Sequence, residues 1–165
     1  MRKNKKRNHQ KHPVPNHKYK DRLFRLVFNN KRDLLDLYNA LNNTCYENPN
    51  DLEVNTLEDA VYLSMKNDIS FLIGGTLNLY EHQSTYNPNM PLRGLIYLAR
   101  LYDGYVETKN INLYSSSLKK LPIPQYFVFY NGTKEQPDET ILQLTDAFES
   151  VSDNRQPCLQ CTAVM

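Results

Sequence analysis

Residues 67–84 read NDISFLIGGTLNLYEHQS, and this stretch decides the expected fold. Gly74 and Gly75 lie between two β-prone segments, and glycine readily takes the positive φ angles that a two-residue hairpin turn requires. The stretch therefore predicts a β-hairpin whose strands span residues 68–73 and 76–81.

The two-residue turn also determines which residues face each other across the hairpin. Ile73 is then opposite Thr76, and continuing that pairing outward places Asp68 opposite Glu81. Opposed residues share a face of the sheet, with Cβ atoms about 5 Å apart. Gln83 is two positions beyond Glu81 and therefore lies on the same face. The hairpin thus predicts a polar cluster of Asp68, Glu81 and Gln83.

Two carboxylates at that distance repel each other unless a cation lies between them. Mg²⁺ or Mn²⁺ is the expected partner of Asp68 and Glu81, because hard divalent ions prefer carboxylate oxygens. Such an ion can activate a water and stabilise the charge on a phosphate under attack. Glu81→Ala is then expected to leave the fold intact and to relieve a like-charge contact in the metal-free protein. The alternative is that Asp68 precedes the strand, Glu81 ends it, and both face solvent, as a slip of one residue would produce.

Helical spacing of apolar residues precedes the hairpin. It covers residues 23–28 and, after an interruption at Asn29–Asn30, residues 34–41, which predicts two helices. A short strand is expected near residues 52–55. Residues 60–65 are apolar, without a period that decides between helix and strand.

Beyond the hairpin, a further helix and strand are expected. Pro91 suits the first turn of a helix, and one helical face is expected to carry Leu92, Leu95, Ile96, Ala99 and Tyr102. Residues 103–121 are polar and predict a loop, residues 123–130 predict a strand, and little order is expected after Thr145. The fold class is therefore α/β, with helices flanking a small mixed sheet around a central hairpin at 68–81.

The totals are those of one globular domain. The chain has 165 residues, of which 40% are hydrophobic and 23% charged, so a hydrophobic core is possible. No apolar stretch is long enough to cross a bilayer, and none follows the charged N-terminus as it does in a secretory signal. We therefore expect a soluble cytoplasmic protein whose cysteines, Cys45, Cys158 and Cys161, are free thiols and hold no zinc.

Charge is distributed unevenly along the chain. Residues 1–20 hold eight Lys or Arg and no acid, whereas the other 145 residues carry a net charge of −6. Basic side chains release counterions from phosphates, so this arm, with Lys3, Lys5, Lys6 and Arg7 near its start, suits DNA as a partner. The alternative is a solvated tail that keeps the chain soluble. The expected organisation is a disordered arm (1–20), a domain (21–148) and an irregular tail (149–165).

Four segments carry a resemblance to a known family. They are KDRLFRLVF at 20–28, NDISF at 67–71, LYEHQSTYNPNMPLRGLIYLARLY at 79–102 and FVFYNG at 127–132. Together they resemble the recombination-promoting nuclease and transposase branch of the PD-(D/E)XK nuclease superfamily. The most specific part is Glu-His-Gln-Ser followed by Met-Pro-x-Arg and a Tyr-containing helix. The likeness covers roughly residues 20–148.

The resemblance implies a restriction-endonuclease-like core and a magnesium-dependent or manganese-dependent hydrolase that cleaves DNA. Asp68 and Glu81 would be the metal ligands. Gln83 stands where many members of the superfamily have Lys, and it would hold the attacking water without being able to take its proton.

The resemblance also assigns supporting residues. Arg93 would neutralise a phosphate or brace Glu81, Tyr97 one turn later would help to line the site, and Asp21 best matches an acid of the family's opening helix. His82, by contrast, alternates to the opposite face from Glu81, where a packed histidine is expected. Family members usually continue past the last residue of this chain, so the alternative is a catalytically inactive, truncated DNA-binding remnant.

Overall fold

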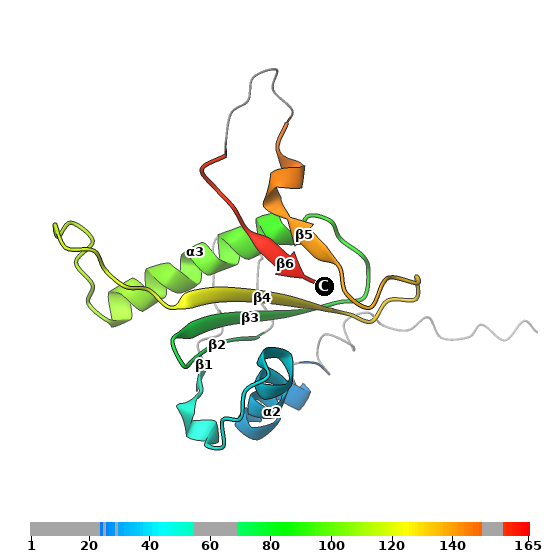
Figure 1. Cartoon of the computed structure of the whole chain (residues 1–165), viewed down its shortest axis with the longest axis horizontal. Coiled ribbons are helices and arrows are strands. Elements are labelled where there is room, and N and C mark those ends of the chain that lie inside the picture. Colours follow the sequence, from blue (N-terminus) through cyan, green and yellow to red (C-terminus); the bar gives the residue numbers. More distant parts are fainter. Residues whose placement is uncertain (1–23, 25, 29, 55–68, 150–156) are drawn as a thin grey trace, which may run out of the picture.

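The computed structural model describes residues 24, 26–28, 30–54, 69–149 and 157–165. These residues form an α/β fold whose mixed sheet has the strand order β1-β2-β3-β4-β6-β5, with α3 over one face and α2 over the other (Figure 1). The strands are β1 (Glu53–Val54), β2 (Ile69–Ile73), β3 (Thr76–Gln83), β4 (Ile123–Tyr130), β5 (Ile141–Gln143) and β6 (Thr162–Val164). The helices are α2 (Lys31–Asn42) and α3 (Met90–Thr108), and two 3-10 turns are η1 (Pro49–Asp51) and η2 (Leu144–Ala147).

The predicted hairpin is confirmed. Strands β2 and β3 are antiparallel, and their five residue pairs run from Ile73 opposite Thr76 to Ile69 opposite Tyr80. The two turn glycines both have positive φ, as this turn requires. Asp68 lies outside the described residues, so its position opposite Glu81 stays a prediction.

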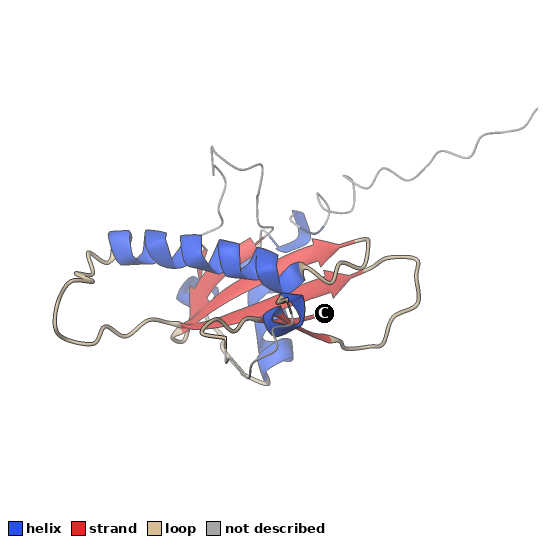
Figure 2. Ribbon diagram, turned by 90° about the horizontal axis from the view of Figure 1, so that it is seen from above, coloured by secondary structure: helices blue, strands red, loops and turns tan. Residues whose placement is uncertain are grey.

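Strand β3 lies inside the sheet, with β2 on one side and β4 on the other. β4 is parallel to β3, and Glu81 is opposite Val128 in that pair. Parallel neighbours need a crossover connection, which α3 supplies as it runs along one face of the sheet (Figure 2). Because β3 is covered on both faces, six consecutive residues of this strand are buried.

The alternation along β3 divides the core into two clusters. Leu77 and Leu79 pack with Tyr97, Leu98 and Tyr126 on the α3 face. The α2 face is rich in aromatic rings, including Phe24, Phe71, Tyr80, Phe127 and Phe129. One strand therefore supplies the cores of both layers.

Helix α2 is capped at both ends by an asparagine, Asn30 and Asn43. The side chain of Asn30 accepts a hydrogen bond from the backbone N–H of Arg32, which caps the helix N-terminus. Asn43 takes the left-handed conformation that commonly ends a helix. The expected strand near residues 52–55 is also present, as β1. Of residues 23–28, the described ones are helical, and residues 60–65 lie outside the description.

Two expectations for α3 are wrong. The helix continues to Thr108, so residues 103–108 are not a loop; their polar side chains belong to a solvated helix face. The buried face is also rotated from the predicted one, since it carries Gly94, Tyr97, Leu98 and Leu101 while Leu92 is exposed. The physical reason is Gly94, whose missing side chain lets the helix lie directly against β4.

The C-terminal part contains more regular structure than the sequence indicates. β6 pairs with β4 through Phe127 and Val164, and it runs antiparallel to β5. Ala163 in β6 is fully buried. All three cysteines are free, as expected. Among the described residues, no helix is both long enough and apolar enough to span a membrane.

Candidate functional site

Glu81 is the one buried carboxylate among the described residues, with 1% of its surface exposed. It is near the end of β3 and follows Leu77 and Leu79 on the face that α3 covers. A carboxylate in such a place is costly unless charged or hydrogen-bonding groups compensate for the lost water. The structure places two such groups on it.

Arg93 and Tyr126 hold the same oxygen of Glu81. Nη2 of Arg93 lies 3.2 Å from Oε2 of Glu81, and the Tyr126 hydroxyl donates to Oε2 at 3.3 Å. Arg93 comes from the first turns of α3 and Tyr126 from β4, so three elements meet at this carboxylate. Its orientation is therefore determined from two directions.

The guanidinium of Arg93 is itself held by its own helix. Nη2 donates to the Tyr97 hydroxyl at 3.4 Å, and Nη1 lies 3.6 Å from Sδ of Met90. Burial lowers the pKa of Arg93, but the charge of Glu81 and the contact with Tyr97 outweigh burial and raise it overall. Arg93 is therefore a fixed cation beside Glu81.

The Tyr126 hydroxyl stays protonated, and so can donate to Glu81, because it is buried. Burial raises the pKa of its hydroxyl, and the nearby charge of Glu81 raises it further. Its ring lies against Gly94, where an added Cβ would come within 2.4 Å of ring carbons. Because Gly94 has no side chain, α3 can pack directly against the ring of Tyr126, which is on β4, the strand next to Glu81.

Part of this cluster is predictable from the sequence. Arg93 braces Glu81, which is one of the two roles predicted for it, and Tyr97 adjoins Arg93. Gln83 belongs to the same face of β3 and is half-buried. Tyr126 and Gly94 were missed. Gly94 could have been found, because a glycine inside a helix, directly after Arg93, indicates a close contact with another element. Tyr126 could not, because its position depends on the pairing of β3 with β4, which no local pattern specifies.

His82 lies on the opposite face, as predicted. Its ring centre is 5.6 Å from that of Phe24, so it packs against the aromatic cluster of the α2 face. The other predicted site residues lie outside the described residues, and their roles stay predictions. They are Asp68, Asp21 and, in the arm, Lys3, Lys5, Lys6 and Arg7.

The ion pair bears on one expectation about stability, which stays a prediction. Glu81→Ala was expected to relieve repulsion between carboxylates in the metal-free protein. The structure pairs Glu81 with Arg93, so removal of the carboxylate leaves a partly buried guanidinium without its counter-charge. We therefore expect that change to be destabilising, because breaking a buried pair from one side costs more than the pair contributes.

The donor chemistry around Glu81 suits a hard divalent ion. Carboxylate and carboxamide oxygens, as Glu81 and Gln83 carry, are of the type that Mg²⁺ and Mn²⁺ prefer. Within the described ranges, no group of three or more His, Cys, Asp or Glu residues is arranged to hold a metal. A metal site here therefore needs the second carboxylate that the sequence predicts, Asp68.

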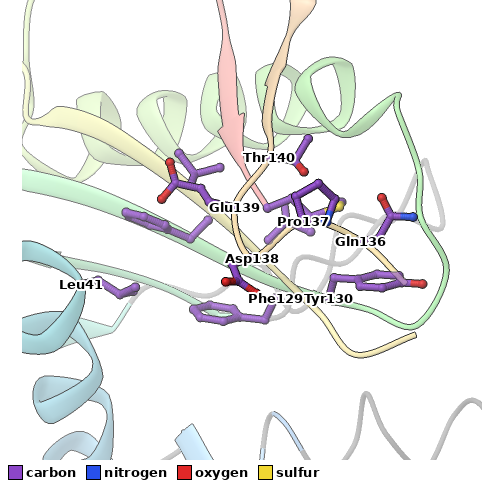
Figure 3. Close-up of a pocket in the computed structure, with 12 residues that line it drawn as sticks. Leu41, Phe129, Tyr130, Gln136, Pro137, Asp138, Glu139 and Thr140 are labelled. Carbon is purple, nitrogen blue, oxygen red and sulfur yellow. The ribbon is translucent and has the colours of Figure 1, made fainter. Parts of the chain in front are cut away.

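A cavity lies elsewhere on the molecule, away from the cluster around Glu81. A cavity of about 530 Å³ is lined by the end of β4, the turn before β5 and the last residues of the chain, and Figure 3 shows Asp138 close to Phe129. None of Glu81, Gln83, Arg93 and Tyr97 lines it. The cavity is therefore separate from the candidate site.

Comparison of the chain with known protein families, with curated proteins and with solved structures finds no match.

Proposed function

We propose that the protein is a metal-dependent DNA endonuclease with a restriction-endonuclease-like core, of the kind that acts in recombination and transposition. The observation that carries this proposal is the buried Glu81 on a central strand, oriented by Arg93 and Tyr126. Catalytic carboxylates need such support, because a ligand acts well only when neighbouring groups fix its direction. Gln83, next on the same face, adds a group that can position water.

In this proposal Asp68 and Glu81 hold the divalent ion. The ion, when bound, lowers the pKa of a water and stabilises negative charge on the phosphate. Arg93 and Tyr126 keep the Glu81 carboxylate in one orientation through Oε2. Gln83 orients the water by hydrogen bonds but takes no proton from it, since a carboxamide is not a base at neutral pH.

A second candidate function is DNA binding without hydrolysis. The observation that favours it is the contact of 3.2 Å between Arg93 and Glu81. Arg93 already supplies the positive charge that a divalent ion would bring to this carboxylate. A protein in which this pair is permanent would bind DNA through other basic residues and cleave nothing.

Nicking of supercoiled plasmid by the purified chain distinguishes these functions. We expect nicking with Mg²⁺ or Mn²⁺, none in chelator, and none with Glu81→Gln, which keeps the shape of the side chain. The matched control is Glu139→Gln, an exposed carboxylate outside the site, which should nick at the wild-type rate. Nicking that persists in chelator and in Glu81→Gln would refute the assignment of the active site.

Gln83 provides a graded test of the same site. Gln83→Ala should slow nicking about 10-fold to 100-fold without abolishing metal binding, as is usual for a supporting group. Gln83→Lys should raise the rate, because it adds the positive charge that the wider superfamily uses. Isothermal titration with Mn²⁺ is the companion measurement. A wild-type protein that binds DNA but neither binds Mn²⁺ nor nicks is the non-catalytic protein.

The basic arm is tested separately by its deletion. If residues 1–20 contact DNA phosphates, each lost contact removes about 0.9 from the slope of log affinity against log salt concentration. We therefore expect a shallower slope for the chain that starts at Asp21, measured by fluorescence anisotropy with a labelled duplex. An unchanged slope would make the arm a solubility tail.

A further inference from the structure

Arg100 lies on α3 two turns after Arg93, and the two arginines differ in their partners. Both terminal nitrogens of Arg93 contact acceptors or sulfur, as described above. Nη1 of Arg100 is also buried, but no hydrogen-bond acceptor meets it in the part of the chain that the structure describes. A buried guanidinium N–H without an acceptor is costly and rare in folded proteins. This nitrogen therefore marks a place where an acceptor is missing.

Arg100 lines a cavity of about 240 Å³ between the second half of α3 and the edge strand β1. Lys109 supplies a second cation to its wall, and Leu72 and Leu101 supply apolar surface. Gly104 contributes no side chain, and a Cβ built there would meet nothing within 4 Å. The cavity thus has open space beside a half-buried arginine whose Nη1 is buried without an acceptor among the described residues.

The acid Glu53 also lines this cavity, so the wall of the cavity carries both positive and negative charge. Glu53 lies 3.8 Å from Nζ of Lys109, and both side chains are largely exposed, so the pair holds Lys109 only weakly. Glu53 also lines a neighbouring hollow of about 180 Å³, where Asp51 adds a second carboxylate. Lys109 and Glu53 line both hollows, so the cavity beside Arg100 differs in charge by having Arg100 in its wall in place of Asp51.

We propose that the cavity beside Arg100 binds a phosphate group. The planar fork of arginine matches the oxygens of phosphate, and Lys109 adds a flexible second donor from another direction. The site is independent of the proposed metal chemistry at Glu81. The phosphate belongs either to a DNA strand or to a free nucleotide or phosphate ion. Arg93 is engaged by Glu81, whereas Nη1 of Arg100 has no acceptor among the described residues.

Thermal unfolding of the full chain without divalent metal tests the site. Sodium phosphate should raise the melting temperature above that in sodium chloride of equal ionic strength. Arg100→Gln should weaken phosphate binding about tenfold or more, because it removes charged hydrogen bonds. The matched control is Arg32→Gln, an exposed arginine whose partner is Asp36 on the same helix, and it should respond as the wild type does.

Two further measurements complete the test. Arg100→Lys keeps the charge and should retain part of the phosphate response, which also covers the case in which Arg100→Gln fails to fold. A 12-nucleotide single strand that displaces phosphate identifies DNA as the source, and displacement by a 5′-mononucleotide alone identifies a free ligand. Stabilisation by phosphate no greater than by chloride, or equal in wild type and Arg100→Gln, would overturn the proposal.

Discussion

The two faces of β3 bury their residues by different means. On the α2 face, Phe71 and Tyr80 meet edge to face with ring centres 5.1 Å apart, and Tyr80 meets Phe127 in the same way at 5.5 Å. On the α3 face the apolar Leu77 and Leu79 give way to Glu81, which Arg93 and Tyr126 compensate. One face therefore depends on ring packing, and the other depends on a charge that three elements must converge to satisfy.

This difference predicts different responses to substitution. Aromatic pairs contribute through buried area and preferred ring geometry, so losing one ring costs energy in proportion to the cavity that it leaves. A buried ion pair contributes little net stability, but the removal of one partner is severe and the removal of both is mild. The faces are thus distinguishable by single and double substitutions.

The largest expected effect is on the aromatic face. Phe71→Ala removes a fully buried ring that contacts both Tyr38 and Tyr80, and it should lower the free energy of unfolding by about 3–5 kcal/mol. Urea denaturation followed by circular dichroism measures the change. Leu37→Ala is the control and should cost less, because Leu37 is a half-buried aliphatic residue that packs against the same cluster. An equal cost for the two variants would show that ring packing does not dominate this face.

The second-largest effect is expected when one partner of the ion pair on the α3 face is removed. Glu81→Ala should cost about 3 kcal/mol, the low end for a broken buried pair, because the Arg93 side chain is 28% exposed and keeps some water. The double variant Glu81→Leu with Arg93→Met replaces the pair by apolar side chains and should recover most of that loss. If the double variant is as unstable as the sum of its single changes, the pair is not the source of the effect.

A smaller effect is expected where the helix meets the sheet. Gly94→Ala places a methyl group against the Tyr126 ring, and such overpacking should cost about 1–3 kcal/mol. Alanine otherwise favours a helix by about 1 kcal/mol, which makes Gly104→Ala the natural control, since open space surrounds that position. Gly104→Ala should be stabilising when both variants are measured by thermal unfolding. Stabilisation by Gly94→Ala as well would mean that the helix can move away from Tyr126 at no cost.

These contrasts also explain which features the sequence could predict. The hairpin is predictable because its turn glycines and its pairing are local, and the position of Gln83 on the face of Glu81 follows from strand alternation. The buried face of α3 is not predictable from periodicity, because a tertiary contact between Gly94 and Tyr126 sets it. β6 is three residues long, which is too short to carry a period. The convergence of Arg93 and Tyr126 on one oxygen likewise depends on how distant segments pack.

The smallest expected effect compares the two buried tyrosines, one on each face. Tyr126→Phe removes the hydrogen bond to Glu81 and should cost about 1 kcal/mol at neutral pH.

Burial raises the pKa of both Tyr126 and Tyr80 above the usual value of 10.0. A folded-state pKa above the unfolded one stabilises the protein fully below pH 10, and that stability is lost as the pH rises beyond it, because only the unfolded chain then releases the protons. Unfolding free energies measured between pH 8 and about pH 11 should therefore decline for the wild type above pH 10, and each of Tyr126→Phe and Tyr80→Phe should make the decline shallower. The two substitutions should have similar effects up to pH 11, since burial keeps both hydroxyls protonated in the folded protein over that range and only the unfolded chain ionises. A decline that is the same in the wild type and in Tyr126→Phe would show that this hydroxyl ionises as readily in the folded protein as in the unfolded chain, and would remove it from the Glu81 cluster.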